Sequence, residues 1–214
     1  MKFIAFDLEG VFIRRSAGHL AHKEWFRRVG DLSDKEIENI DNEDYFDHVF
    51  TLMEEKTDLD RNKEKDRKLM TKLARSLFQE IYLHHIQKLK GRIEIHETIE
   101  FARSLKGYKL ALITTTPDDI VKSILKIIDC EDLFDVIVAS PLEHKPNKRR
   151  LFEMFIKDHG KPMIYFCDRK GDVAACKKLG IKSALVMLDI YDDAKADFRV
   201  KSKKDMEEVL KGNL

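Results

Sequence analysis

The sequence of 214 residues predicts an α/β protein: a Rossmann-like, five-stranded parallel sheet with helices on both faces, plus an all-helical cap inserted after the first strand. Five short apolar runs have the length and composition of strands buried on both faces. The last four alternate with segments of helical periodicity, and this alternation is typical of a parallel sheet. The five runs are residues 3–6, 110–113, 136–139, 163–166 and 184–187.

The interval between the first two runs is about a hundred residues long, far more than a single crossover helix needs. Two stretches within it have apolar residues at helical spacing. We therefore predict a core formed by residues 1–13 and 92–214, and a helical cap formed by residues 14–91. The apolar positions are Ile37, Ile40, Phe46, Val49, Phe50 and Met53 in one stretch, and Leu69, Met70, Leu73, Ala74, Leu77, Phe78 and Ile81 in the other.

The charge of the chain is nearly balanced, with 40 Lys and Arg against 39 Asp and Glu. The net charge of +1 creates no general attraction for nucleic acid or for an anionic membrane, so we expect neither as a partner. No apolar run has the length of a signal peptide core or of a membrane span. The three cysteines lack C-x-x-C spacing and suit reduced thiols, so we expect a cytoplasmic protein; the sequence leaves its oligomeric state open.

Polar residues follow four of the five predicted strands. In an open parallel sheet, ligands bind beyond the carboxyl ends of the strands, so these residues should gather in one crevice. Three carboxylates placed there would repel one another unless a cation lay between them, and oxygen ligands without clustered His or Cys suit Mg²⁺. The residues are Asp7 and Glu9, Thr114 and Thr115, Lys145, and Asp168 and Asp172.

These residue types together can perform phosphoryl transfer. The Thr114 hydroxyl and the Thr115 backbone N–H can bind phosphate oxygens, while Lys145 supplies a fixed positive charge. The reaction requires a nucleophile, neutralisation of the phosphoryl oxygens and a group that handles the proton of the leaving alcohol. We assign these roles to Asp7, to Mg²⁺ with Lys145, and to Glu9.

Four short segments carry a resemblance to a known family. Residues 7–11 (DLEGV), 113–115 (ITT), 144–146 (HKP) and 168–172 (DRKGD) are similar, in order and in strand context, to the four motifs of haloacid dehalogenase superfamily phosphatases. The predicted insert matches the helical C1-type cap of that family in position and length. The chain thus resembles members such as the phosphoserine and phosphoglycolate phosphatases.

The resemblance implies a Mg²⁺-dependent phosphatase that hydrolyses a small phosphorylated metabolite through an aspartyl phosphate on Asp7. It implies that Asp7, the main-chain carbonyl of Glu9, and Asp168 hold the metal, and that Asp172 steadies the metal-bound waters. The cap would close over the leaving group and exclude water from the first half of the reaction.

The sequence departs from the family pattern at three places in these motifs. Glu9 stands where Asp is usual, so its carboxylate reaches farther from the backbone. Cys167 replaces the usual Gly before Asp168, and Arg169 stands where a small residue is common. Arg169 either pairs with a carboxylate, contacts the substrate or lies on the surface.

Other positions bear on substrate and activity. Arg14 and Arg15 lie where the chain enters the cap, and contact either an acidic substrate or only solvent. Ser16 occupies the place at which phosphoserine phosphatases have a glutamate for the amino group of the substrate, which disfavours phosphoserine. Two alternatives remain open: a phosphotransferase or phosphomutase that uses the same intermediate, and a catalytically silent relative that binds a phosphorylated ligand.

Overall fold

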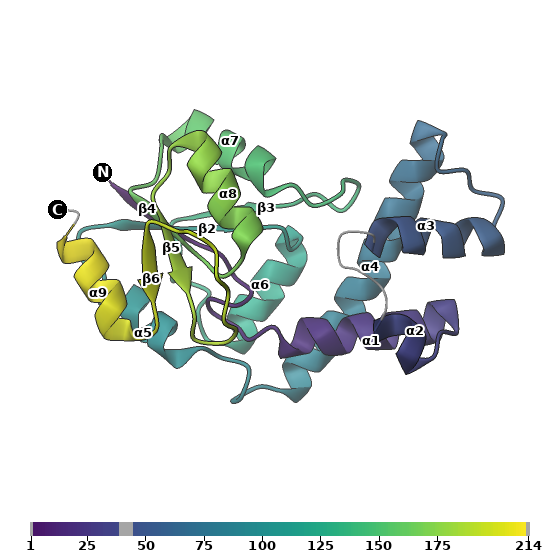
Figure 1. The fold of residues 1–214 in the computed structure, drawn as a ribbon, viewed down its shortest axis with the longest axis horizontal. Coiled ribbons are helices and arrows are strands. Elements are labelled where there is room, and N and C mark those ends of the chain that lie inside the picture. Colours follow the sequence, from purple (N-terminus) through teal and green to yellow (C-terminus); the bar gives the residue numbers. More distant parts are fainter. Residues whose placement is uncertain (1, 39–44, 213–214) are drawn as a thin grey trace. The chain divides into compact units, whose positions relative to one another are not determined.

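The computed structural model describes residues 2–38 and 45–212 (Figure 1). The chain forms two compact units. The first contains Met1–Arg15, Lys90–Ser140 and Pro146–Leu214, and the second contains Ser16–Leu89 and Pro141–Lys145. None of the described helices is both long enough and apolar enough to cross a membrane.

A parallel sheet forms the centre of the first unit, in the order β3-β2-β1-β4-β5-β6. The structure confirms the α/β class, and each predicted apolar run coincides with a strand to within one residue at either end. The sixth strand, β6, corrects the predicted count of five. It was missed because it is only three residues long and lies at the sheet edge, with Arg199 exposed to solvent. The strands are β1 (Phe3–Phe6), β2 (Lys109–Thr114), β3 (Val136–Ala139), β4 (Ile164–Cys167), β5 (Ser183–Val186) and β6 (Phe198–Val200).

Helices cover both faces of this sheet (Figure 1). One face is covered by α7 and α8, and the other by α5, α6 and α9. Successive side chains of a strand point to opposite faces of the sheet, so an uninterrupted apolar run makes both faces apolar. The helices are α5 (His96–Ser104), α6 (Asp118–Ile127), α7 (Lys148–His159), α8 (Lys170–Leu179) and α9 (Lys203–Lys211).

Aromatic side chains contribute to the core on each side of the sheet. On one face the rings of Phe6 and Phe166 stack with their centroids 5.0 Å apart, and Phe101 of α5 packs edge-on against Phe166. On the other face Tyr165 of β4 packs edge-on against Phe152 of α7, at a centroid distance of 4.7 Å. The central strands and the loops that follow them are therefore firmly held.

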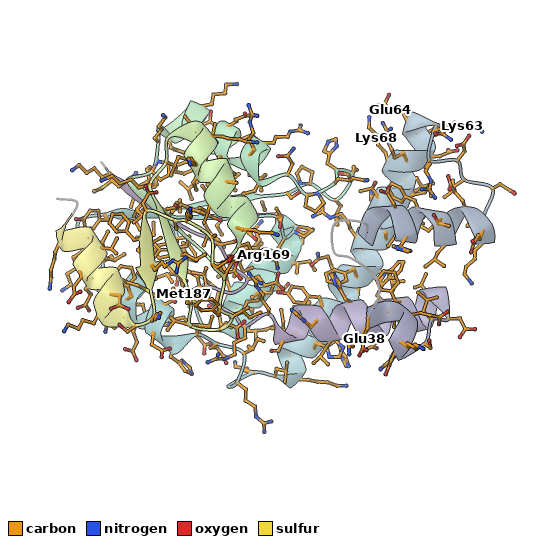
Figure 2. The ribbon with its side chains drawn as sticks, viewed as in Figure 1. Glu38, Lys63, Glu64, Lys68, Arg169 and Met187 are labelled. Carbon is orange, nitrogen blue, oxygen red and sulfur yellow. The ribbon has the colours of Figure 1, made fainter. Side chains whose placement is uncertain are left out.

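The second unit is helical and contains α1 (Ser16–Gly30), α2 (Asp34–Glu38), α3 (Tyr45–Lys56) and α4 (Glu64–Lys88). The helical character predicted for this part of the chain is confirmed, although Ile40 of the predicted pattern lies outside the described residues. In α4, Met70 and Ala74 are buried, whereas Leu69 and Leu73 are exposed by 44% and 48%. The surface of α4 also carries charged pairs, such as Lys68 and Glu64, whose side chains are 2.6 Å apart (Figure 2).

The segment Pro141–Lys145 belongs to this helical unit, although it lies between two stretches of the sheet unit in the sequence. Arg75 of α4 is only 4% exposed and donates hydrogen bonds to the carbonyl oxygens of Pro141 and His144, the latter over 2.7 Å. The buried guanidinium thus binds two backbone carbonyl groups of this loop.

Candidate active site

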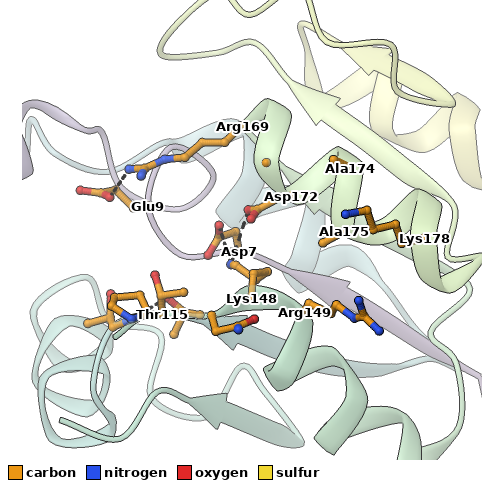
Figure 3. Close-up of a pocket in the computed structure, with 15 residues that line it drawn as sticks. Asp7, Glu9, Thr115, Lys148, Arg149, Arg169, Asp172, Ala174, Ala175 and Lys178 are labelled. Atoms are coloured by element: carbon orange, nitrogen blue, oxygen red, sulfur yellow. Dashed lines mark hydrogen bonds and ion pairs between the residues drawn. The ribbon is translucent and has the colours of Figure 1, made fainter. Parts of the chain in front are cut away.

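Three neighbouring strands place functional side chains at one edge of the sheet. Asp7 follows β1, Thr114 ends β2 and Asp168 follows β4. Because β1 pairs with both β2 and β4, Asp7 lies between the other two. A cavity of about 470 Å³ opens there (Figure 3). Its lining includes Asp7, Glu9, Thr114, Thr115, Thr116, Asn147, Lys148, Arg149, Arg169 and Asp172.

Asp7 is held rigidly at the centre of this site. Its backbone N–H donates to the carbonyl oxygen of Phe166 over 2.8 Å, and its Oδ1 accepts a hydrogen bond from the Leu8 N–H over 2.8 Å. Burial alone would raise the pKa of Asp7, but the charge of Lys148 and hydrogen bonds to Asp172, Lys148 and Leu8 lower it below the ordinary value. The carboxylate is therefore ionised, as a nucleophile must be.

The cation that the structure places beside Asp7 is Lys148, whereas the sequence prediction names Lys145. Lys148 Nζ lies 2.8 Å from Asp7 Oδ2 and 3.5 Å from Asp172 Oδ2. Burial would lower the pKa of Lys148, but attraction to Asp172 and Asp7 raises it above the ordinary value, so the ammonium is charged. Lys145 instead lies in the helical unit, with its Nζ 3.7 Å from Asp47 Oδ1.

The choice between the two lysines has a local physical reason. Asn147 caps α7, its side chain accepting a hydrogen bond from the Arg150 N–H over 3.1 Å, so that Lys148 is the first residue of the helix. A capping residue directly before an amphipathic stretch is visible in the sequence. The resemblance of residues 144–146 to a family motif drew the assignment to Lys145 and away from this signal.

Thr114 and Thr115 lie in the cavity lining, as the sequence predicts. Thr114 is almost fully buried, and its Oγ1 accepts a hydrogen bond from the Thr116 N–H over 3.2 Å. This bond bends the chain sharply at the end of β2, so that three successive threonines border the cavity. Thr116, which follows the same predicted strand in the sequence, is the third of them.

Three buried carboxylates form a cluster suited to a cation. Asp7, Asp168 and Asp172 each offer one oxygen, and these oxygens all lie within 4.8 Å of one another. Burial, together with repulsion from Asp7, raises the pKa of Asp168 to about 6 and the pKa of Asp172 to about 8, against the opposing effects of Arg15 and Lys148. Removing three carboxylates from water beside one another is unfavourable without a compensating charge.

The oxygens of this cluster are also incompletely paired. Asp168 Oδ1 and Asp172 Oδ2 are buried and accept no hydrogen bond among the described residues. Hard divalent cations such as Mg²⁺ prefer oxygen ligands of this kind. The donor set therefore fits Mg²⁺, with Asp7 and Asp168 as the carboxylates placed to hold it and Asp172 beside them.

Gly10 makes room for Asp168. Its φ of +75° lies in the left-handed region that glycine adopts readily, and a methyl group at this position would lie 1.6 Å from Asp168 Oδ2. The close approach of backbone and carboxylate thus requires glycine here for two independent reasons.

The Glu9 carboxylate forms an ion pair with Arg169. The Arg169 Nη2 lies 2.6 Å from Glu9 Oε2, and Figure 3 shows the carboxylate turned toward Arg169 and away from Asp7. Of the interpretations that the sequence leaves open for Arg169, the structure supports pairing with a carboxylate. Both residues line the cavity.

Arg14 and Arg15 bind other parts of the same unit. The Arg15 side chain donates to the Asp168 carboxylate and, over 2.9 Å, to the Asp168 carbonyl oxygen. The Arg15 backbone N–H donates to Asp189 Oδ2 over 2.7 Å, and Arg14 Nη1 lies 3.4 Å from Asp189 Oδ1. Within the sheet unit, the two arginines therefore tie the loops after β4 and β5 to the segment that follows β1, rather than facing only solvent.

Comparison with known proteins identifies the family. Residues 4–186 match the model of the haloacid dehalogenase-like hydrolases. A curated relative, the phosphoglycolate phosphatase of Aquifex aeolicus, is 30% identical over 135 residues, which cover 56% of this chain and 62% of the relative. The match thus spans less than two thirds of that relative's length.

Solved structures share the fold. A haloacid dehalogenase-like family hydrolase from Streptococcus pneumoniae superposes with a TM-score of 0.70 at 18% identity, covering 98% of both chains. A β-phosphoglucomutase from Clostridium difficile gives a TM-score of 0.70 at 18% identity, covering 100% of this chain and 96% of that one. With the family match over most of its length, this chain belongs to the haloacid dehalogenase-like hydrolase family.

Proposed function

We propose that this protein is a Mg²⁺-dependent phosphatase that hydrolyses a small phosphorylated metabolite through an aspartyl phosphate on Asp7. The observation that carries the proposal is the arrangement around Asp7. An ionised, buried carboxylate borders a cavity, with a buried ammonium 2.8 Å away and two further carboxylates close by. Mg²⁺ bound at this cluster would neutralise charge on the transferring phosphoryl group.

In the first half of the reaction, an Asp7 oxygen attacks phosphorus and the bond from phosphorus to the leaving oxygen breaks. The Lys148 ammonium stabilises the charge of the phosphoryl oxygens, and the Thr114 hydroxyl and Thr115 N–H bind them. Glu9 in its protonated form donates a proton to the leaving alcohol. For this step the Glu9 side chain must turn from Arg169 toward the site.

In the second half, water attacks the phosphorus of the aspartyl phosphate. Glu9, now ionised, takes the proton from that water, and the bond between phosphorus and the Asp7 oxygen breaks to release inorganic phosphate. The residue that served as acid thus serves as base, and Asp7 is regenerated.

The substrate class is a small phosphate monoester. The curated relative is a phosphoglycolate phosphatase, so phosphorylated carboxylic acids are the first compounds to test. A phosphotransferase or phosphomutase remains the second candidate, because a β-phosphoglucomutase shares the fold and such enzymes begin with the same attack. The fate of the phosphoryl group separates the two: a phosphatase releases inorganic phosphate in water alone.

The test is phosphate release from p-nitrophenyl phosphate and from a panel of phosphorylated acids and sugars, with and without Mg²⁺. We expect Mg²⁺-dependent turnover that is lost in Asp7→Asn. Lys148→Ala should lower kcat/KM by roughly 10²- to 10³-fold, the usual effect of removing a group that stabilises transition-state charge, whereas Lys145→Ala should change it little. Equal turnover of wild type and Asp7→Asn would overturn the nucleophile, and absence of turnover on the whole panel would favour a silent relative.

A further inference from the structure

Tyr165 lies directly behind Lys148 in a part of the core that the proposed chemistry does not otherwise use. It belongs to the central strand β4 and is fully buried. Its hydroxyl donates to the carbonyl oxygen of Ile113 over 2.8 Å, and Lys148 Nζ donates to the Tyr165 oxygen over 2.7 Å. A side chain of the core thus contacts the cation of the site.

The bonds around Lys148 leave its ammonium little freedom. An ammonium has three N–H donors, and Lys148 has three close acceptors: Tyr165 Oη at 2.7 Å, the Ile113 carbonyl oxygen at 3.0 Å and Asp7 Oδ2 at 2.8 Å. Two of them are fixed in strands β2 and β4, and only the third is a reacting group. The two acceptors in the strands therefore fix the position of the Lys148 ammonium.

Tyr165 is itself rigid and uncharged. Its ring packs edge-on against Phe152, with the centroids 4.7 Å apart, inside the core between the sheet and α7. Burial raises the pKa of Tyr165 well above its ordinary value, so the hydroxyl keeps its proton. A neutral oxygen orients the ammonium without cancelling its charge, which a carboxylate in the same place would do.

We propose that Tyr165 is a positioning residue for phosphoryl transfer, which holds Lys148 Nζ against Asp7 so that the phosphoryl group meets an already oriented cation. This inference rests on the function proposed above. Its physical basis is preorganisation: a lysine has four flexible bonds, and fixing its charge before the substrate arrives removes that reorganisation from the reaction barrier.

The test is Tyr165→Phe, which keeps the ring and removes the one oxygen. We expect kcat/KM to fall roughly 10- to 100-fold, the effect of losing a hydrogen bond to a charged group. In the Lys148→Ala background the same substitution should have almost no further effect, because there is no ammonium left to position. Phe155→Leu, in the same core cluster, controls for loss of core packing. An additive effect in the double variant, or an equal loss in Phe155→Leu, overturns the proposal.

A second measurement does not depend on turnover. Crystal structures of the wild type and of Tyr165→Phe should show Lys148 Nζ displaced by more than about 0.5 Å, the tolerance of a preorganised site. If Nζ keeps its place, the proposal is wrong whatever the rates. If the wild type hydrolyses nothing but Nζ moves, the phosphatase assignment fails while the positioning of Lys148 by Tyr165 stands.

Discussion

Glu9 accepts an ion-paired hydrogen bond from Arg169 over 2.6 Å, and its carboxylate points away from the nucleophile. The group proposed to move protons is therefore held away from Asp7 by a charged neighbour. Both side chains are partly exposed, by 25% and 52%, so the pair is weak enough to open during the reaction.

Arg169→Ala should release Glu9 toward the leaving group. Alkyl phosphates need protonation of the leaving oxygen more than aryl phosphates do. We therefore expect kcat to rise by about two- to fivefold for an alkyl phosphate and to stay nearly unchanged for p-nitrophenyl phosphate. This rise corresponds to an ion pair worth less than about 1 kcal/mol. Steady-state kinetics on both substrates measures this. In the Glu9→Gln background Arg169→Ala should have no selective effect, and equal changes on both substrates would contradict the role of the pair.

Gly10→Ala should destabilise the protein and disturb the carboxylate cluster. The added methyl group would meet Asp168 at 1.6 Å, in addition to the strain of a positive φ, so we expect a loss of more than about 2 kcal/mol in the free energy of unfolding. Gly107→Ala is the matched control, since its φ is +83° and nothing lies within 4 Å of the added carbon. Chemical denaturation of both variants should show the smaller loss, about 1 kcal/mol, in Gly107→Ala; similar losses would mean that the approach of Asp168 is unimportant.

Without metal, the stability of the protein should fall as the pH rises from about 4 to 8. Folding raises the pKa values of Asp168 and Asp172 to about 6 and about 8, from an ordinary value near 3.9. At a pH between the ordinary and the raised value, the folded protein binds more protons than the unfolded chain, so raising the pH favours unfolding. Asp7, with its lowered pKa, acts in the opposite sense only below about pH 4.

Mg²⁺ should reverse this trend, since the cation binds the ionised carboxylates. We expect the increase in Tm caused by millimolar Mg²⁺ to grow between about pH 6 and 8. Thermal unfolding in Mg²⁺ and in EDTA across this range measures it, and Asp172→Asn should flatten the metal-free profile. A metal-induced shift that is independent of pH would argue against binding at this cluster.

Arg75→Ala should destabilise the helical unit, because the hydrogen bonds from Arg75 to the carbonyl oxygens of Pro141 and His144 are lost. We expect a loss of about 1–3 kcal/mol in the free energy of unfolding, the cost of removing hydrogen bonds made by a charged group. Lys72→Ala is the control. Lys72 lies on the same helix as Arg75, and its exposed Nζ is 3.7 Å from Glu143 Oε1, so losing this pair should cost less than about 1 kcal/mol. Faster proteolysis at residues 141–145 in Arg75→Ala, but not in Lys72→Ala, would complete the test; equal stability of the two variants would contradict it.

The sequence predicts the sheet well because its strands are buried on both faces and so appear as uninterrupted apolar runs. Strand β6, which contains Arg199, does not appear as such a run, because an edge strand needs apolar residues on one side only. Asp7, Thr114 and Asp168 could be found because each directly follows or ends such a run, and topology alone brings strand ends together.

The rest of the site depends on contacts between distant segments. Lys148 lies on a helix rather than at a strand end, and its orientation comes from Tyr165, which in the sequence is one more apolar strand residue. The pairing of Arg15 with Asp168 joins residues 153 positions apart, and no local pattern indicates it. Side chains placed at strand ends were therefore predictable, whereas the long-range contacts that orient them were not.

The membership of Pro141–Lys145 in the helical unit has a consequence for how such proteins exchange parts. A cap moved into a relative as residues 16–89 alone would separate Arg75 from the carbonyl oxygens of Pro141 and His144 that it binds in this chain. A working chimera must carry the five-residue loop along with the cap, as two pieces grafted at separate points of the chain. Recombination at a single pair of breakpoints cannot achieve this, so the cap and this loop are expected to change together.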